Sequence, residues 1–83
     1  MNTDQLLSSI QPIIADCLQM NKNTITDQLS MDNTPNWDSI GLINIITSLE
    51  HHLSIEIDLE DAEKMTSIKA ILELLNTKYI STP

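Results

Sequence analysis

The chain of 83 residues contains one cysteine, one glycine, no phenylalanine and no arginine, and these shortages exclude several classes of function. The single cysteine, Cys17, cannot form an internal disulfide, which is compatible with a reducing cytoplasm. Four lysines against twelve Asp and Glu residues give a net charge of −8. Such a surface repels phosphate backbones and anionic lipids, so we expect neither nucleic acid nor membrane as a partner. It would attract basic patches on other proteins, although acids alone also keep a small protein in solution.

Aromatic side chains are nearly absent, since Trp37 and Tyr79 stand alone in a chain that is 41% apolar. A core of Leu, Ile and Met favours packed helices over a strand-rich sandwich, which prefers aromatic and β-branched residues. A chain of this length forms at most one domain, residues 1–83, and cannot enclose a deep catalytic cavity. Its first residues lack a basic segment and no apolar run approaches about 18 residues, so we expect neither a signal peptide nor a membrane span.

The residues for several kinds of catalytic or metal chemistry are also missing. One cysteine and two adjacent histidines, His51 and His52, cannot assemble a tetrahedral zinc site. The acidic run Asp58–Lys64 ("DLEDAEK") lacks the glycine that a calcium loop needs at its sharp turn. The further glycines of a phosphate-binding loop are absent too. We therefore expect that the chain is not an enzyme.

Helical spacing of the apolar residues predicts an all-α bundle of three main helices plus one short helix. We expect helices over about 4–20, 39–52, 59–64 and 67–79, with Thr66 capping the last. Pro12 leaves two possibilities for the first helix, which either starts near Ser8 or Ser9, or starts at Asp4 and kinks.

A long loop over residues 21–37 connects the first and second expected helices. It is rich in Asn, Asp, Thr and Ser, which favour turns. Because compact domains rarely leave so many residues without structure, the loop should be functional or packed on the core. Ile25, Leu29 and Met31 are the side chains expected to attach it.

The most apolar helix begins with Asp38 and Ser39, and it departs from local rules there. Either residue is a good N-cap, and most such pairs do nothing else. The helix lacks the Glu or Gln of a capping box, and Gly41 costs about 1 kcal/mol relative to alanine. Ile40 and Ile43 lie off the apolar stripe and should be exposed. Such departures are typical of a working site, which makes Ser39 a candidate for recognition by another protein's active site.

The stretch Trp37–Leu75 ("WDSIGLINIITSLEHHLSIEIDLEDAEKMTSIKAILELL") resembles the acyl carrier protein family, the phosphopantetheine-bearing carriers of fatty acid, polyketide and related pathways. The resemblance depends on Asp-Ser followed by an apolar residue at the start of a helix that ends in Leu-Glu-x-x-Leu. "IEI" followed by "DAEKMTSI" strengthens it. It implies a four-helix bundle with a long first loop and a short third helix.

The resemblance also implies that Ser39 receives 4′-phosphopantetheine from coenzyme A, added by a phosphopantetheinyl transferase. Asp38 matches the acidic residue that helps this transferase bind its metal and coenzyme. The arm would hold an acyl or aminoacyl group as a thioester, sheltered between the second and third helices. Loading ligases or transferases, synthases and tailoring enzymes would do the chemistry. Gly41 would leave room beside Ser39 for the arm or a partner, unless it is tolerated drift.

The second helix differs from that of fatty-acid carriers, which usually have acids along its exposed side. Here Glu50 is the only acid on that side, and the acidity lies around the short third helix instead. We expect partners to contact Ile40, Gly41, Ile43, Asn44, Thr47, Glu50, Glu60 and Asp61.

This pattern favours a discrete carrier of a specialised polyketide, peptide or related pathway, recognised more by apolar contact and shape than by charge. Two alternatives stay open. One is a housekeeping carrier of fatty acid synthesis, and the other is an unmodified acidic helical interaction module that docks through Ile40 and Ile43. All of them predict a soluble, cytoplasmic monomer.

Overall fold

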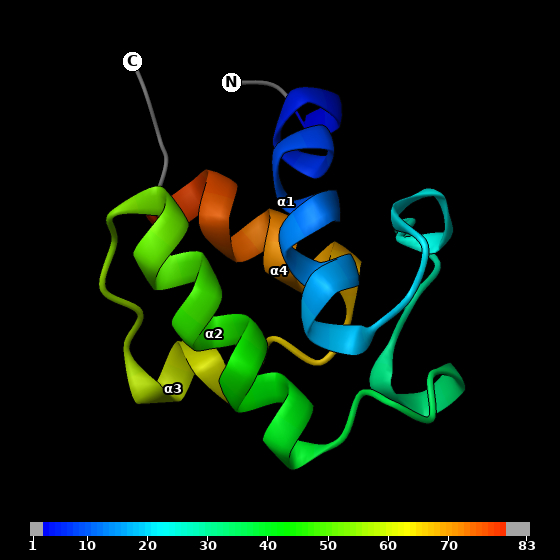
Figure 1. Cartoon of the computed structure of the whole chain (residues 1–83). Helices are drawn as coiled ribbons and strands as arrows, with labels where there is room; N and C mark the ends of the chain where they lie inside the picture. The colour runs from blue at the N-terminus through cyan, green and yellow to red at the C-terminus, as the bar shows by residue number, and fades with distance from the viewer. Residues whose placement is uncertain (1–2, 80–83) are drawn as a thin grey trace.

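The computed structural model describes residues 3–79, which fold as a bundle of helices around one apolar core (Figure 1). The elements are α1 (Thr3–Leu18), η1 (Lys22–Thr24), η2 (Met31–Asn33), α2 (Ser39–Leu53), α3 (Leu59–Ala62), α4 (Ile68–Leu74) and the π-helical turn η3 (Leu75–Tyr79). Within residues 3–79 no strand forms, and one isolated bridge pairs Ser30 with Ser67. The predicted all-α bundle of three main helices and one short helix is confirmed.

Helix α1 starts at Thr3 and contains Pro12, so the early of the two predicted starts is correct. It ends at Leu18, about one half-turn before the expected end, because Gln19 adopts a left-handed conformation with φ 55°. The Met20 N–H then donates to the Ala15 carbonyl at 2.9 Å. A left-handed residue of this kind satisfies helix carbonyls and stops the helix.

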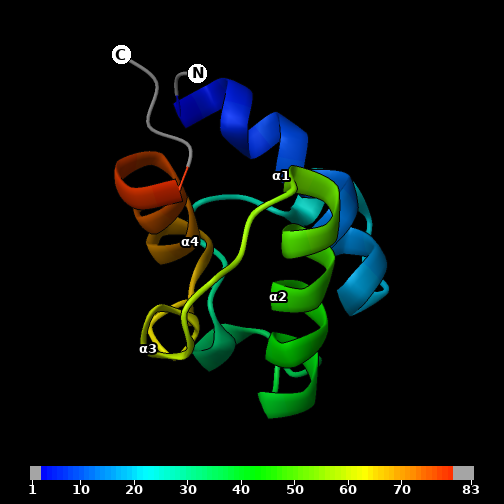
Figure 2. The ribbon, with the colours of Figure 1, turned by 90° about the vertical axis from the view of Figure 1, so that its left-hand side faces the viewer.

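The core is largely aliphatic, as the composition predicts, and is formed by the inner sides of α1, α2 and α4 together with Leu75 of η3 and buried residues of the connections, among them Ile57 and Met65. Side chains that are at most 2% exposed include Leu6, Ile10, Ile14, Leu18, Ile45, Leu49, Ile68, Ile71 and Leu75. Figure 2 shows α2 on one side and α3 and α4 on the other. Each buried Leu or Ile contributes about 1.5–3 kcal/mol, so these side chains supply most of the stabilisation.

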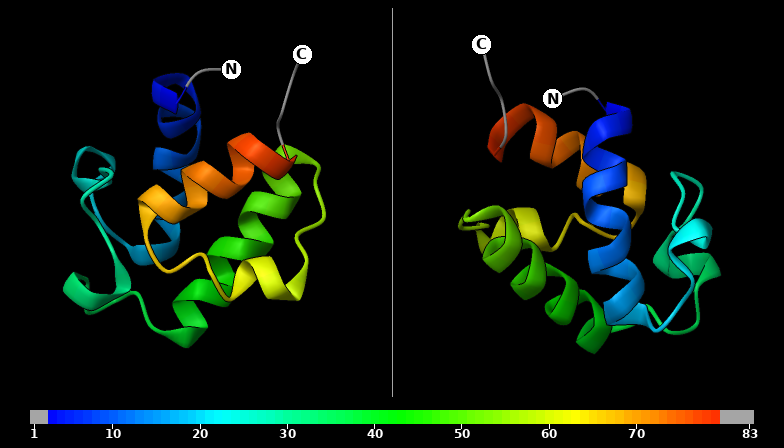
Figure 3. Two further views of the ribbon diagram at one scale, coloured as in Figure 1. Left: turned by 180° about the vertical axis from the view of Figure 1, so that it is seen from behind. Right: turned by 45° about the horizontal axis from the view of Figure 1, so that its top comes forward.

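The long loop between α1 and α2 is attached to the core by apolar side chains. Ile25 is fully buried, and Leu29 and Met31 pack against the core, so the predicted anchors are confirmed. Backbone bonds add to this attachment: the Met31 N–H donates to the Thr66 carbonyl (2.9 Å) and the Ile68 N–H donates to the Leu29 carbonyl (3.0 Å). The loop is therefore fastened to the N-terminal end of α4 (Figure 3).

The last helix has a different cap from the one expected. The Ser67 hydroxyl accepts a hydrogen bond from the Ala70 N–H at 3.0 Å, so Ser67 is the N-cap and the assignment to Thr66 is wrong. Thr66 instead contributes its carbonyl to the contact with the long loop. Helix α3 stops at Ala62, before the expected Lys64.

Candidate functional site

Ser39 is the first residue of α2 and is exposed. The N-cap is Asp38, whose carboxylate oxygen Oδ1 accepts a hydrogen bond from the Gly41 N–H at 2.8 Å. Capping therefore uses the side chain of Asp38 rather than that of Ser39. The sequence places both residues correctly at the helix start but cannot say which of them is the cap.

Gly41 is buried, and this corrects its assignment to a surface for the arm or a partner. A Cβ at this position would lie 2.9 Å from the carbonyl oxygen of Asn36 and 3.7 Å from the Leu18 side chain. The Asn36 side chain in turn donates to the Leu18 carbonyl at 3.1 Å. Glycine is thus required because α2 starts in direct contact with the backbone of the long loop, so tolerated drift does not explain it either.

A groove of about 400 Å³ separates α2 from the segment that contains α3. Helix α2 lines it with Ser39, Leu42, Ile43, Ile46 and Thr47, and the opposite wall is lined by Ile57, Leu59, Ala62 and Glu63. Most of these side chains are apolar. Ser39 therefore lies beside a cavity that suits a hydrocarbon chain.

Large apolar side chains are exposed around this groove. Ile40 is 70% exposed and Ile43 63% exposed, as the helical stripe predicts. Leu59, which the sequence did not single out, is 76% exposed. Leu59 is the first residue of a short helix and has an acid on either side, and this position in the sequence could have predicted its exposure. Grouped exposed hydrophobics of this kind mark interaction sites.

The acids expected to face partners divide into two groups. Glu60 is exposed, as are the polar residues Asn44 and Thr47. By contrast Asp61 is only 5% exposed, and the Glu50 carboxylate accepts a hydrogen bond from the Ile57 N–H at 2.8 Å. The expectation of a partner-facing Asp61 is therefore wrong, and Glu50 is occupied by a contact within the chain.

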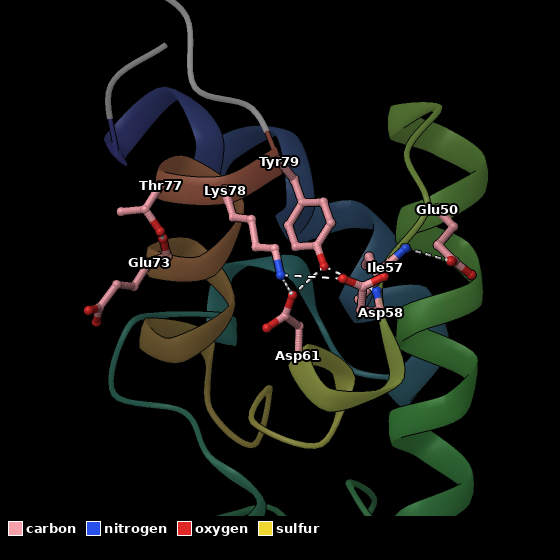
Figure 4. Close-up of polar contacts among 8 residues, drawn as sticks. All are labelled: Glu50, Ile57, Asp58, Asp61, Glu73, Thr77, Lys78 and Tyr79. Atoms are coloured by element: carbon pink, nitrogen blue, oxygen red, sulfur yellow. Dashed lines mark hydrogen bonds and ion pairs between the residues drawn. The ribbon is translucent and has the colours of Figure 1, made fainter.

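Asp61 lies in a polar cluster with residues of η3 (Figure 4). Its oxygen Oδ2 accepts hydrogen bonds from the Lys78 ammonium (2.6 Å) and the Tyr79 hydroxyl (2.5 Å). The bond from Lys78, followed by that from Tyr79, lowers the pKa of Asp61, while burial opposes this shift. The ion pair raises the pKa of Lys78 in return. The sequence did not predict this cluster, because its members are far apart along the chain.

Other kinds of site are not found in the part of the chain that the structure describes. Residues 3–79 contain no group of three or more His, Cys, Asp or Glu side chains that could hold a metal ion. None of the helices in this range is long and apolar enough to cross a membrane. Cys17 is half-buried between α1 and α2, with its sulfur 3.3 Å from the Ser48 hydroxyl.

Comparison with known proteins agrees with this geometry. The family model described as "Phosphopantetheine attachment site" matches residues 8–75. The chain is 30% identical to an acyl carrier protein of Thermosynechococcus vestitus, over 94% of this chain and 96% of that protein. It is 32% identical to an acyl carrier protein of Rubrobacter xylanophilus, over 88% and 90%. The solved structure of the acyl carrier protein from Enterococcus faecalis matches with a TM-score of 0.67 and 29% identity, covering 90% of this chain and 95% of that one.

The helical bundle and the family match define a carrier domain for phosphopantetheine. The chain belongs to the acyl carrier protein family. It is accordingly a carrier rather than a catalyst, with covalently attached 4′-phosphopantetheine, and it works with a phosphopantetheinyl transferase and acyl-handling enzymes. This membership excludes the unmodified interaction module.

Proposed function

We propose that this chain carries its 4′-phosphopantetheine on Ser39 and presents an acyl or aminoacyl group to partner enzymes. The observation that carries the proposal is the position of Ser39, exposed at the start of α2 and lining the apolar groove. The bound group supplies a thiol that holds the cargo as a thioester. The residues present fit such a group, since they offer an accessible hydroxyl next to a cavity for a hydrocarbon chain.

The start of α2 suits a phosphodiester on electrostatic grounds. Ser39 is the first of the 15 residues of α2 and therefore lies at the N-terminal end of the helix, where the helix dipole is positive. A negative group there is stabilised by about 0.3–1 kcal/mol. Asp38 is exposed beside Ser39, and in our proposal its carboxylate helps the transferase to bind its metal and coenzyme.

The groove would shelter the cargo chain between α2 and the segment Ile57–Glu63. Leu42, Ile43 and Ile46 offer apolar surface on one side, and Ile57 and Ala62 on the other. Each methylene that enters such a site is stabilised by about 0.8 kcal/mol. The amino-acid sequence does not select a particular acyl group, because every apolar chain gains in the same way.

For the partners we propose a specialised polyketide, peptide or related pathway. The exposed positions Ile40, Ile43, Asn44 and Thr47 carry no charge, and the one acid of α2, Glu50, binds the backbone at Ile57. Docking on this face would therefore depend on apolar contacts, which salt screens little. A reconstituted fatty-acid elongation assay tests this choice. We expect poor elongation, and efficient elongation would instead support the housekeeping carrier.

Intact-mass spectrometry tests the attachment site. The protein is measured before and after incubation with coenzyme A, magnesium and a broad-specificity phosphopantetheinyl transferase. We expect a gain of one phosphopantetheine, abolished in Ser39→Ala and retained in Ser9→Ala, which removes another exposed serine. A gain that persists in Ser39→Ala would contradict the assignment to Ser39.

A further inference from the structure

Helix α3, which forms part of the groove wall, buries no apolar side chain of its own, although Ile57 before it and Met65 after it are buried in the core. Helix α3 has four residues, and the only one that is buried is the charged Asp61. Leu59, its largest apolar residue, is 76% exposed. Buried carboxylates require hydrogen-bond partners. Between these two anchors, the position of α3 therefore depends on the groups that bind Asp61.

Both partners of Asp61 come from consecutive positions at the other end of the chain. Figure 4 shows Lys78 and Tyr79 converging on Asp61 from η3. The Lys78 ammonium also lies 3.3 Å from the Asp58 carboxylate, and the Tyr79 hydroxyl accepts a hydrogen bond from the Asp58 N–H at 3.1 Å. The same two side chains thus hold both the residue before α3 and the buried residue within it.

We infer that Asp61, Lys78 and Tyr79 form a latch that holds α3 in place and so keeps the groove closed around its cargo. The three are positioning residues, because they act on the groove wall and line no part of the groove. This inference rests on the proposed function of the groove. The bond from the Ile57 N–H to Glu50 secures the start of the same wall to α2 and complements the latch.

The charges around the latch favour the closed arrangement near neutral pH. The hydrogen bonds from Lys78 and Tyr79 lower the pKa of Asp61, so the carboxylate is ionised. Lys64 contributes a weaker attraction to Asp61, and Asp58 adds a second carboxylate beside Lys78. Burial, followed by the bond to Asp61, raises the pKa of Tyr79, so its hydroxyl keeps the proton that it donates.

Amide hydrogen exchange in the unmodified protein tests the latch directly. Tyr79→Phe removes the hydroxyl and keeps the ring. The variant loses two hydrogen bonds, one to the Asp61 carboxylate and one from the Asp58 N–H. We therefore expect the Ala62 and Glu63 amides at the end of α3, which bond to the Asp58 and Leu59 carbonyls, to exchange about fivefold faster or more. The amides of α1 and α2 should be unchanged.

The control variant is Thr77→Ala, in the same turn. Its hydroxyl donates to the Glu73 carbonyl at 2.7 Å, and Figure 4 shows this pair apart from the cluster at Asp61. Exchange in α3 should match that of the wild-type protein. Equal exchange in Tyr79→Phe, Asp61→Asn and the wild type would overturn the latch.

A second measurement tests the effect on cargo. Wild type, Tyr79→Phe and Asp61→Asn are loaded with octanoyl- or acetyl-phosphopantetheine, and cleavage of the thioester by hydroxylamine is timed. The octanoyl thioester should be cleaved about threefold faster in both variants, because the closed state loses part of its population. The acetyl thioester is too short to use the groove and should be cleaved at equal rates.

The two proposals fail in different ways. Absence of a mass gain at Ser39 would overturn the proposed function and, with it, the role of the latch toward cargo. Equal octanoyl protection in loaded wild type and Tyr79→Phe would overturn that role alone. If wild type protects octanoyl no better than acetyl, the groove shelters no chain and the inference is wrong.

Discussion

The two long connections of this molecule are both anchored in the apolar core, but they differ in how the segments nearest Ser39 are held. The connection between α1 and α2 is held by buried apolar side chains, above all Ile25 and Trp37, which are 0% and 2% exposed. The connection between α2 and α4, which contains α3, also buries two apolar side chains, Ile57 and Met65, but α3 itself is held by the polar contacts of Asp61. Both lie next to Ser39, the first through the loop that leads into α2 and the second across the groove.

This difference in attachment predicts that the two segments beside Ser39 differ in how easily they open. Apolar anchoring depends little on pH and is lost only when the core opens. Helix α3 buries no apolar side chain, and regions with few buried apolar contacts open at lower cost. We therefore expect the side that presents Ser39 to be the more rigid one, and α3, across the groove, to open more easily. In the proposed function, this combination would allow the carrier both to shelter and to release its cargo.

Trp37→Ala should have the largest effect, because it removes the main apolar anchor of the first connection. We expect a loss of about 3–5 kcal/mol in the free energy of unfolding, measured by circular dichroism in urea. Trp37→Phe is the control. The indole N–H is buried without a hydrogen-bond partner among residues 3–79, so its removal leaves no partner unpaired. A loss below about 1 kcal/mol in Trp37→Ala would contradict apolar anchoring.

Gly41→Ala tests the contact between this connection and α2. Alanine normally stabilises a helix relative to glycine by about 1 kcal/mol. Here its Cβ would meet the Asn36 backbone oxygen at 2.9 Å, and a backbone atom cannot move as freely as a side chain. We expect a net destabilisation of about 1–3 kcal/mol in urea unfolding. A stabilised variant would show that the loop shifts easily and that the first connection is less rigid than we argue.

Asp38→Ala tests the start of α2, where the first connection leads into the helix that begins with Ser39. It removes the hydrogen bond to the Gly41 N–H and should cost about 1 kcal/mol of unfolding free energy. Asp38→Asn keeps a capping oxygen and should be nearly neutral. Asp38→Asn should nevertheless lower the rate of modification by the transferase, if the charge assists that enzyme. Equal loss of stability in both variants would mean that Asp38 acts through its charge and not as a cap.

Sequence patterns predict best what depends on residues close together in the chain. The spacing of Leu, Ile and Met located the main helices, and Ile40 and Ile43 were correctly expected at the surface. Asp38 and Ser39 were placed at the start of α2 because caps precede an apolar periodic segment. Each of these inferences uses neighbours within one or two helical turns.

One error is local, since the N-cap of α4 is one residue later than expected. The other errors concern contacts that helical periodicity does not describe. Gly41 was attributed to the surface because it is next to Ser39 in sequence, yet its constraint comes from the backbone of Asn36. In the acidic run around α3, periodicity alone could not show that Asp61 points inward. Its partners, Lys78 and Tyr79, are 17 and 18 residues away. The polar contacts of α3 therefore could not be predicted from sequence patterns, whereas the apolar attachment of the first connection was partly predicted through Ile25.

The smallest expected effect is a difference in how the two connections respond to pH. The destabilisation caused by Asp61→Asn should depend on pH, whereas that caused by Trp37→Ala should not. The pKa of Asp61 is lowered from its ordinary value of 3.8, so its contribution to stability is complete above that value and is lost as the pH falls through the lowered pKa. The pKa values of Lys78 and Tyr79 are raised from 10.5 and 10.0, so their contributions are complete below pH 10.0 and are lost at higher pH. The stability difference between wild type and Asp61→Asn, measured in urea, should thus be constant from about pH 5 to pH 9 and shrink below pH 3.8. Trp37→Ala should show a difference from wild type that stays constant over the same range, because no titratable group carries its anchoring. A gap for Asp61→Asn that persists unchanged into acid would show that the carboxylate is not what holds α3.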